Sequence, residues 1–274
     1  MPKNEKHVIS PGGEGYRLDK ALHAFLPDTG LRLRRRLCDD ERVLVDGRPQ
    51  KPGYKVSRGQ EIEIVGGLAV LSPESLGLKL VARGETFATV FKPGGVHSAA
   101  IAGRDEPSVE AVLPELLPDE QPLLLNRLDN LTSGLLLVGL GQEAGELYRK
   151  YETQGRIMKF YLTKVAGRLD GTVIVRSRLD TDDRKTTRVL TEDDKDDCRW
   201  TFVTSLAHDH TQDTTLARCL ILKGARHQIR AHLASIDHPI IGDPLYGDGD
   251  GGVLFLHHYR IELPGFSTEI TPIF

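Results

Sequence analysis

The sequence predicts an α+β protein built from two domains of unequal size. Its 274 residues are enough for one large and one small domain, and an apolar fraction of 39% is adequate for a core. Two helix-spaced segments followed by short strands predict a compact module over residues 16–66. From Phe87 onward the pattern changes to mixed strands and helices, and a larger domain is expected over residues 80–274.

The small module begins with apolar positions at helical spacing between residues 18 and 26. Asp28 and Thr29 offer N-cap side chains for a second, arginine-rich helix near Leu31–Asp40. Two short strands joined through a turn complete the module: Val43–Val45, Asp46-Gly47 and Glu61–Val65.

Polar, glycine-rich stretches flank this module. Residues 1–15 are expected to be a flexible lead-in, and residues 67–79 a linker. The acidic stretch Glu192–Asp197 is interpreted as a solvated hairpin tip. In the large domain the expected strands are Phe87–Phe91, Leu135–Val138, Tyr161–Ala166, Val173–Val175, Trp200–Ser205 and Thr215–Leu222. The expected helices are Glu106–Leu117, Glu143–Glu152 and His227–Ile236.

Charge and cysteine content narrow the class of protein. The net charge is −3, yet residues 16–66 hold 11 Lys and Arg against 8 Asp and Glu, a weak indication of a polyanion-binding module against the alternative of scattered charge. Cys38, Cys198 and Cys219 lie far apart without zinc-ligand spacing, which predicts a reducing compartment and no metal site. The N-terminus has no signal-peptide core, and no apolar run reaches the roughly 20 residues that cross a membrane. We therefore expect a cytoplasmic protein with no membrane contact.

A polar segment, Asn126–Gly134, directly precedes the apolar strand Leu135–Val138. A loop at the edge of a rigid sheet is a favoured position for functional side chains. Asp129 in this loop has the chemistry of a nucleophile toward a sugar carbon. The structural alternative is an aspartate that caps a turn and pairs with Arg127, and this segment by itself favours that alternative.

Two further segments have patterns that suit a binding cleft. In Lys159–Gly167, strand alternation places Tyr161 on a face where an aromatic ring either stacks on a base or belongs to the core. Gly224–Leu233 holds two Arg and two His within seven residues at a helix start, which suits contact with phosphate or carboxylate. Asp248–Gly251 superficially suggests calcium, but the twelve-residue loop with its terminal Glu is missing.

Taken in order, motifs between residues 80 and 265 resemble the RluA-type pseudouridine synthases. The matching residues are Lys92-Pro93-Gly94-Gly95 and His97, Arg127-Leu128-Asp129, Thr132-Ser133-Gly134, Lys159 and Tyr161, His227-Gln228-Ile229-Arg230, His232-Leu233, His238-Pro239-Ile240, Gly242-Asp243, Tyr246-Gly247 and Leu256-His257. Each motif alone is weak to moderate, and the ordered set is specific. The resemblance implies a mixed, largely antiparallel sheet with flanking helices and loops.

The small module resembles the alpha-L RNA-binding domain found in a ribosomal protein of the small subunit. The resemblance rests on Arg17-Leu18-Asp19-Lys20, the Arg32–Arg36 helix, Val43–Gly47 and Gly59–Ile62. Basic side chains there would contact phosphates and position RNA without reading its sequence. The expected RNA-binding residues are Arg17, Lys20, Arg32, Arg34, Arg35 and Arg36.

The resemblance to the synthases implies isomerisation of uridine to pseudouridine in structured RNA, with the target base flipped from its stack. Catalytic roles follow for Asp129, which acts on the ribose or the base, for Tyr161, which stacks on uracil, and for Arg230, which pairs with Asp129. No cofactor is implied, ribosomal RNA is the favoured partner with transfer RNA second, and we expect a monomer. The expected substrate contacts are Arg127, Thr132, Arg226, His227 and Gln228.

Two departures from the family pattern leave alternatives open. Asn126 stands where the family commonly has His, and Ala225 where it usually has Arg, with Arg226 as a substitute one place later. These departures favour, as a runner-up, a catalytically silent RNA-binding or ribosome-assembly factor. A nucleoside or glycoside hydrolase using Asp129 is a third reading, but the motif lacks a partner carboxylate.

Overall fold

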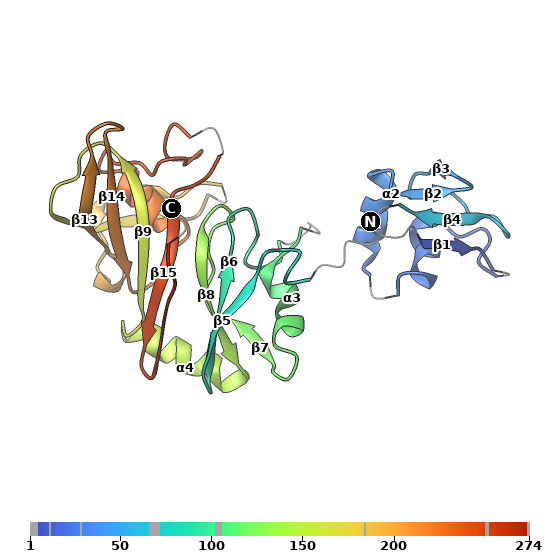
Figure 1. Ribbon diagram of the computed structural model, residues 1–274, viewed down its shortest axis with the longest axis horizontal. Coiled ribbons are helices and arrows are strands. Elements are labelled where there is room, and N and C mark those ends of the chain that lie inside the picture. Colours follow the sequence, from blue (N-terminus) through green and yellow to red (C-terminus); the bar gives the residue numbers. More distant parts are fainter. Residues whose placement is uncertain are drawn as a thin grey trace. The chain divides into compact units, whose positions relative to one another are not determined.

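The computed structural model describes residues 5–10, 12–27, 29–65, 72–101, 106–183, 185–249 and 252–272. The chain falls into two compact units, Met1–Leu71 with Ile101–Asp105, and Ser72–Ala100 with Glu106–Phe274 (Figure 1). The prediction of an α+β fold with a mostly antiparallel sheet is confirmed, and each unit is described below by itself.

The first unit is a four-stranded antiparallel sheet with two short helical segments. The sheet order is β1 (Glu5–Val8), β4 (Glu61–Ile64), β2 (Val43–Val45) and β3 (Arg48–Pro49). α1 (Leu18–Ala21) continues as a 3₁₀ turn over Leu22–Ala24, and α2 (Leu31–Asp39) follows. Apolar side chains of both helical segments and of β2 and β4 form one core.

Two expectations for this unit are wrong. Residues 5–8 do not belong to a loose lead-in, because β1 pairs with the free edge of β4 and Lys6 forms an ion pair with Glu61 at 2.7 Å. Thr29 does not cap α2, whose N-cap is Gly30 without a side-chain hydrogen bond; Thr29 Oγ1 instead donates to the Leu26 carbonyl. Asp28 lies outside the described residues.

The second unit is built on a ten-stranded sheet. Its order is β10 (Thr172–Val175), β13 (Thr201–Asp209), β14 (Thr214–Ile221), β9 (Met158–Ala166), β15 (Leu256–Leu263), β8 (Ser133–Leu140), β6 (Phe87–Lys92) and β5 (Lys79–Arg83). β16 (Phe266–Glu269) pairs with β15, and β7 (Pro122–Leu124) pairs with β8. Among the described residues, β15 and β8 run parallel and the other strand pairings of this sheet are antiparallel.

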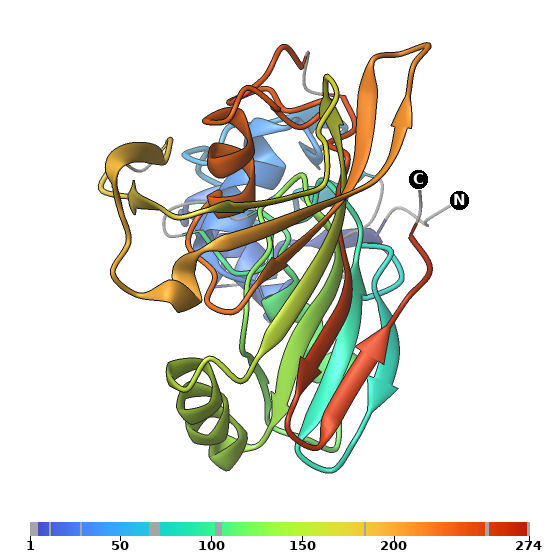
Figure 2. The same cartoon turned by 90° about the vertical axis from the view of Figure 1, so that its left-hand side faces the viewer.

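Helices cover both faces of this sheet. Successive side chains of a strand point to opposite faces, so Leu136 and Val138 of β8 join one core while Leu135 and Leu137 join another. The first core includes side chains of α3 (Val109–Leu116) and α5 (Gln228–Ala234). The second core includes side chains of α4 (Gln142–Thr153), the yellow-green helix beside the lower end of the sheet in Figure 2.

A separate two-stranded hairpin, β11 (Ser177–Asp180) with β12 (Arg188–Asp193), stands off the sheet. The acidic stretch Glu192–Asp197 is therefore not a hairpin tip. It spans the end of β12 and the start of the 3₁₀ turn Asp197–Arg199, where Lys223 binds Asp196 at 2.6 Å.

The expected linker is shorter than predicted. Residues 66–71 lie outside the described residues, whereas residues 72–77 form hydrogen-bonded turns and Leu78 is buried in the core of the second unit. Within the described part of the chain, none of the helices has the length and apolarity needed to cross a membrane.

Candidate active site

Asp129 lies in the connection that leads into β8, and neighbouring residues pin its backbone. Ser98 Oγ accepts from Leu128 N–H at 3.0 Å and donates to the Leu128 carbonyl at 2.8 Å. A turn closes on the other side, where Thr132 N–H donates to the Asp129 carbonyl at 3.1 Å. The position of the carboxylate is therefore set by fixed backbone on both sides.

Lys92, the last residue of β6, binds backbone carbonyl groups of this loop and of the segment that follows β6. Its fully buried ammonium donates to the carbonyls of Pro93, Val96 and Asn130 at 2.8, 2.8 and 3.0 Å. Burial lowers the pKa of Lys92 to about 7, against the opposing pull of the Asp129 charge. Gly94 passes so close to the loop that a Cβ atom there would lie 2.9 Å from the Leu131 carbonyl oxygen.

The side chain of Asp129 is one end of a three-residue ionic chain. Arg230 Nη1 donates to Asp129 Oδ2 at 3.1 Å, and Arg230 Nε and Nη2 each donate to Asp243 at 2.7 Å. Asp243 is fully buried and Arg230 nearly so, whereas 22% of the Asp129 side chain remains exposed. The bidentate contact with Asp243 fixes the guanidinium, so the free end of Arg230 holds the exposed carboxylate.

Asp243 is ionised in this arrangement. Burial acts to raise the pKa of its carboxyl, but hydrogen bonds from Arg230 and from the N–H groups of Leu245 and Tyr246 prevail and lower it. Those backbone bonds also fold the loop so that the Tyr246 ring lies 5.3 Å from the Arg230 guanidinium.

His227 approaches Asp129 from the start of α5. It is the N-cap residue, in the left-handed region with φ of 53°, and its Nε2 lies 3.9 Å from Asp129 Oδ1. Its Nδ1 lies 3.0 Å from the Tyr246 hydroxyl. Burial lowers the pKa of His227, so the imidazole is neutral at neutral pH.

Tyr161 of β9 lies near this cluster, but one face of its ring is covered. His258 of β15 stacks on it with ring centroids 4.5 Å apart, and only 5% of Tyr161 is exposed. Burial first, and the charge of Asp129 second, raise the pKa of Tyr161. Its phenol therefore stays protonated at neutral pH.

The residues expected to contact substrate differ in burial and in hydrogen-bond partners. Arg127 is exposed, and Thr132 is buried with its Oγ1 unpartnered among the described residues. Gln228 is buried, and its amide bonds the Arg199 carbonyl and accepts from Ala225 N–H, so it holds the start of α5 and does not face the solvent. Arg226 Nη2 donates to the carbonyls of Thr181, Asp183 and Thr186, the turn of the β11–β12 hairpin.

The two residues that depart from the family pattern, Asn126 and Ala225, each form a hydrogen bond that involves the backbone. Asn126 Oδ1 accepts from Leu137 N–H at 2.6 Å, which extends the β7–β8 pairing beside the loop. Ala225 is held through its N–H by Gln228 Oε1 at 2.9 Å. Neither side chain belongs to the Asp129 ionic chain.

The basic residues of the first unit divide into paired and open ones. Arg17 and Arg35 both bind the buried Asp19, at 2.9 and 2.8 Å, and Arg36 lies 3.5 Å from Asp40. Arg34 is buried, and Lys20 is exposed. The side chain of Arg32 lies outside the described residues.

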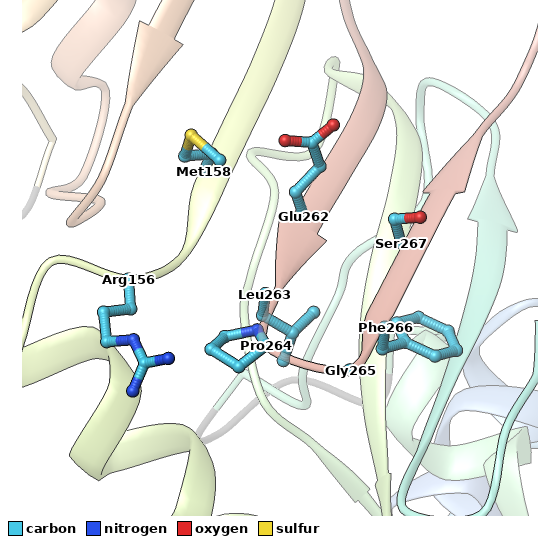
Figure 3. Close-up of a pocket in the computed structure, with 8 residues that line it drawn as sticks. All are labelled: Arg156, Met158, Glu262, Leu263, Pro264, Gly265, Phe266 and Ser267. Atoms are coloured by element: carbon cyan, nitrogen blue, oxygen red, sulfur yellow. The ribbon is translucent and has the colours of Figure 1, made fainter.

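A hollow of about 610 Å³ lies elsewhere, around the β15–β16 turn (Figure 3). Arg156, Met158 and Glu262–Ser267 line it, and no member of the Asp129 cluster is among them. Among the residues that the structure describes, Asp196, Asp197 and Cys198 form the one group with metal-ligand spacing, and Lys223 already engages Asp196.

Sequence reasoning assigned no role to several residues that build this site. Ser98, Lys92, Asp243 and Tyr246 support the loop, Arg230 or His227, although three of them lie in the motifs quoted above. Because they act through other side chains, their part is visible only when distant segments are brought together.

Comparison with known proteins identifies the family of this chain. Residues 86–235 match the RNA pseudouridylate synthase family. The chain is 27% identical to the ribosomal large subunit pseudouridine synthase D of Nitrosomonas europaea over 85% of this chain and 69% of that protein. It is 26% identical to its namesake from Escherichia coli over 88% of this chain and 75% of that protein, and 28% identical to an uncharacterized RNA pseudouridine synthase of Chloroflexus aurantiacus over 88% and 78%.

Solved structures share the fold. Human RNA pseudouridylate synthase domain containing 1 superposes with a TM-score of 0.57 at 24% identity, covering 71% of this chain and 83% of that one. Human RNA pseudouridylate synthase domain containing 4 superposes with a TM-score of 0.55 at 17% identity, covering 70% of this chain and 87% of that one. The chain belongs to the RNA pseudouridylate synthase family, and it is an RNA pseudouridine synthase of the RluA type.

Proposed function

We propose that this enzyme isomerises specific uridines of ribosomal RNA, with Asp129 as the nucleophile and the target uridine flipped out of its stack. The observation that carries the proposal is the partly exposed carboxylate of Asp129, held by an arginine that a second, buried carboxylate fixes in place. A pre-aligned, partly exposed anion at a rigid sheet edge suits attack on a sugar carbon.

Ribosomal RNA is the favoured substrate because the relatives named above as acting on the ribosomal large subunit match most of this chain. The resemblance of the first unit to an alpha-L RNA-binding domain supports the same choice. A ribosomal substrate implies that the enzyme works in the cytoplasm. Transfer RNA is the second candidate.

The proposed reaction balances without an external reagent. The carboxylate of Asp129 attacks C1′ of the ribose and displaces uracil through N1, which takes up a proton. After the base turns, C5 attacks C1′ and displaces the carboxylate, and the hydrogen on C5 is then lost as a proton. The net change is a C1′–N1 bond exchanged for a C1′–C5 bond.

The neighbouring side chains divide the remaining tasks. Tyr161 offers the flipped uracil an aromatic surface, and its raised pKa keeps the phenol protonated, so the basic phenolate is not available at neutral pH. The carboxylate of Asp129, free again after the second displacement, is the better acceptor for the C5 proton. Exposed Arg127 beside Asp129 would fill the space left by the flipped base or hold the RNA backbone.

The test uses ribosomal RNA labelled with tritium at C5 of uridine. Wild-type enzyme should release tritium to water, and Asp129→Asn should release none while it still binds the RNA. Labelled transfer RNA, assayed in parallel, distinguishes the two substrates. Release of free uracil would indicate a hydrolase, and equal inactivity of both proteins on both RNAs would favour a silent RNA-binding factor.

A further inference from the structure

The hydroxyl of Tyr246 is a junction between three segments of the second unit. It accepts from Thr187 N–H, in the loop that precedes β12, at 2.6 Å. It also lies 3.0 Å from Nδ1 of His227, at the start of α5. Its ring lies 5.3 Å from the Arg230 guanidinium, so the phenol is held both by packing and by polar contacts.

The phenol oxygen accepts from Thr187 N–H, and His227 Nδ1 is the remaining hydrogen-bond partner of the hydroxyl among the described residues. If Nδ1 carried a proton, the oxygen would accept a second bond and the hydroxyl proton would have no partner among those residues. The arrangement that uses every donor therefore has the phenol donating to Nδ1. Burial lowers the pKa of His227, which favours the neutral ring that such a bond requires.

We infer that Tyr246 is a positioning residue that holds His227 in the tautomer with its proton on Nε2, so that this N–H faces Asp129. Nδ1 accepts from the phenol, and Nε2–H points to Asp129 Oδ1 at 3.9 Å. Arg230 binds the other oxygen, Oδ2, at 3.1 Å. Oδ2 therefore accepts a hydrogen bond, whereas Nε2–H is a donor just beyond hydrogen-bond distance of Oδ1. Contacts of this kind commonly tighten when substrate binds.

This inference rests on the proposed role of Asp129, and it adds that Tyr246 and His227 orient an N–H group toward that carboxylate. The opposite tautomer would turn the lone pair of Nε2 toward the carboxylate, where the two would repel. The left-handed backbone of His227 and the buried Asp243, whose oxygen accepts from Tyr246 N–H at 3.2 Å, hold the two rings in this register.

The tautomer is measurable without RNA. In protein labelled with ¹⁵N-histidine, two-dimensional spectra distinguish a protonated from an unprotonated ring nitrogen, and His227→Gln assigns the signal by its loss. We expect wild-type His227 to carry its proton on Nε2 at pH 7 and Tyr246→Phe to give a mixture of tautomers. Protonation on Nδ1 in the wild type, or no change in Tyr246→Phe, would overturn the inference.

The activity readout is a double-mutant cycle on tritium release. Tyr246→Phe keeps the ring on Arg230 and should lower kcat about tenfold with little change in KM. His227→Gln retains an N–H near the position of Nε2, and in that background Tyr246→Phe should change kcat less than about twofold. An equal loss in both backgrounds would place the effect of the hydroxyl on Thr187 and the β11–β12 hairpin, and would contradict the inference.

The matched control is Tyr148→Phe. It removes a hydroxyl that donates to Glu152 at 2.9 Å, outside the Asp129 cluster, and should leave kcat and the His227 signal unchanged. Because the tautomer is read on the protein alone, it stands or falls separately from the proposed reaction, which Asp129→Asn tests.

Discussion

At the scale of single residues, the carboxylate of Asp129, the proposed nucleophile, is held through a second carboxylate that is fully buried. Asp243 is fully buried and binds Nε and Nη2 of Arg230 through both oxygens, while Nη1 of Arg230 donates to Asp129. A single buried arginine between two carboxylates is satisfied on both sides. Loss of the buried one should therefore cost folding stability as well as activity.

Asp243→Ala tests this dependence. Arg230 would keep its burial but lose its bidentate partner, which should lower the free energy of unfolding by about 3–5 kcal/mol. Urea unfolding followed by the fluorescence of Trp200, the single tryptophan, reports on the second unit. The exposed pair of Arg168 and Asp170 supplies the control, because Asp170→Ala should cost less than about 1 kcal/mol. Equal, small losses would contradict the account.

Sequence motifs placed Asp129 and Arg230 in the site because a polar loop before an apolar strand and a basic helix start are local patterns. The role of Asp243, which fixes the Arg230 guanidinium, was not predictable from a local pattern. Its side chain acts across 13 residues of chain on an arginine, and only burial distinguishes it from a turn-capping aspartate. Gln228 shows the opposite case. It lies in a family motif and was expected to contact substrate, but its buried amide binds the backbone of Ala225 and Arg199.

At the scale of elements, β15 sets the spacing between the strand that carries Tyr161 and the strand that follows Asp129. It lies between β9 and β8, with the His258 ring on Tyr161 and His258 Nδ1 2.5 Å from the Leu135 carbonyl. Burial lowers the pKa of His258 to about 3, so the ring is neutral. Gly134, with φ of 120°, permits the close approach of the two strands.

Gly134→Ala should break this spacing. A Cβ atom there would lie 2.3 Å from the carbonyl oxygen of His258, a contact that only backbone movement can relieve. We expect a loss of several kcal/mol, about 3 or more, in urea unfolding. Gly224→Ala is the control, since its Cβ would meet nothing closer than a side-chain carbon at 3.8 Å. Wild-type stability in Gly134→Ala would contradict the packing described.

The helical part of the first unit rests on Asp19, which is buried at the start of α1 and bound by Arg17 and Arg35. Hydrogen bonding from Arg17, helped by Arg35, lowers the pKa of Asp19 from 3.8 to about 2. Because the folded-state pKa lies below the unfolded one, this contribution is present above about pH 4 and is lost as the pH falls toward 2.

Asp19→Asn should therefore destabilise the first unit by about 2 kcal/mol at pH 7, and the difference from wild type should close near pH 2. Hydrogen exchange of peptides from residues 18–45 in the full chain, compared between the two proteins at each pH, measures this. A difference that stays constant from pH 7 to pH 2 would show that Asp19 does not act through its charge.

Strands with long apolar or alternating runs were predictable, and so was the short edge strand β10, whereas the central strand β15 was not among the expected strands. β6, β8, β9 and β14 follow apolar or alternating runs and match the expected strands within a few residues. β1, β5 and the β11–β12 hairpin were missed, because such strands carry exposed, charged side chains and are stabilised by pairing partners distant in sequence.

At the scale of the whole molecule, we propose that the two units contribute separately to RNA recognition. Exposed cations on the first unit would add affinity without touching the reactive uridine, while the Asp129 cluster would supply the chemistry. The resemblance of the first unit to an alpha-L domain predicts this division. Composition gave only a weak indication of it, since residues 16–66 hold 11 Lys and Arg against 8 Asp and Glu in a chain with a net charge of −3.

Lys20→Ala with Arg36→Ala tests the division. Lys20 lies on α1 and Arg36 on α2. Their loss should raise KM for RNA and leave kcat unchanged. It should also reduce the salt dependence of binding by about one phosphate contact for each side chain. The matched control is Arg149→Ala with Lys150→Ala on α4, which removes the same charge from the second unit. An equal effect of both pairs would contradict a dedicated RNA-binding role for the first unit.

The most direct test of the central claim is made in the host organism. Deletion of the gene, followed by chemical mapping of pseudouridines in total RNA, should remove specific sites from ribosomal RNA. Complementation with the wild-type gene should restore them, and complementation with Asp129→Asn should not. Restoration by Asp129→Asn, or a pseudouridine map unchanged by the deletion, would contradict the account.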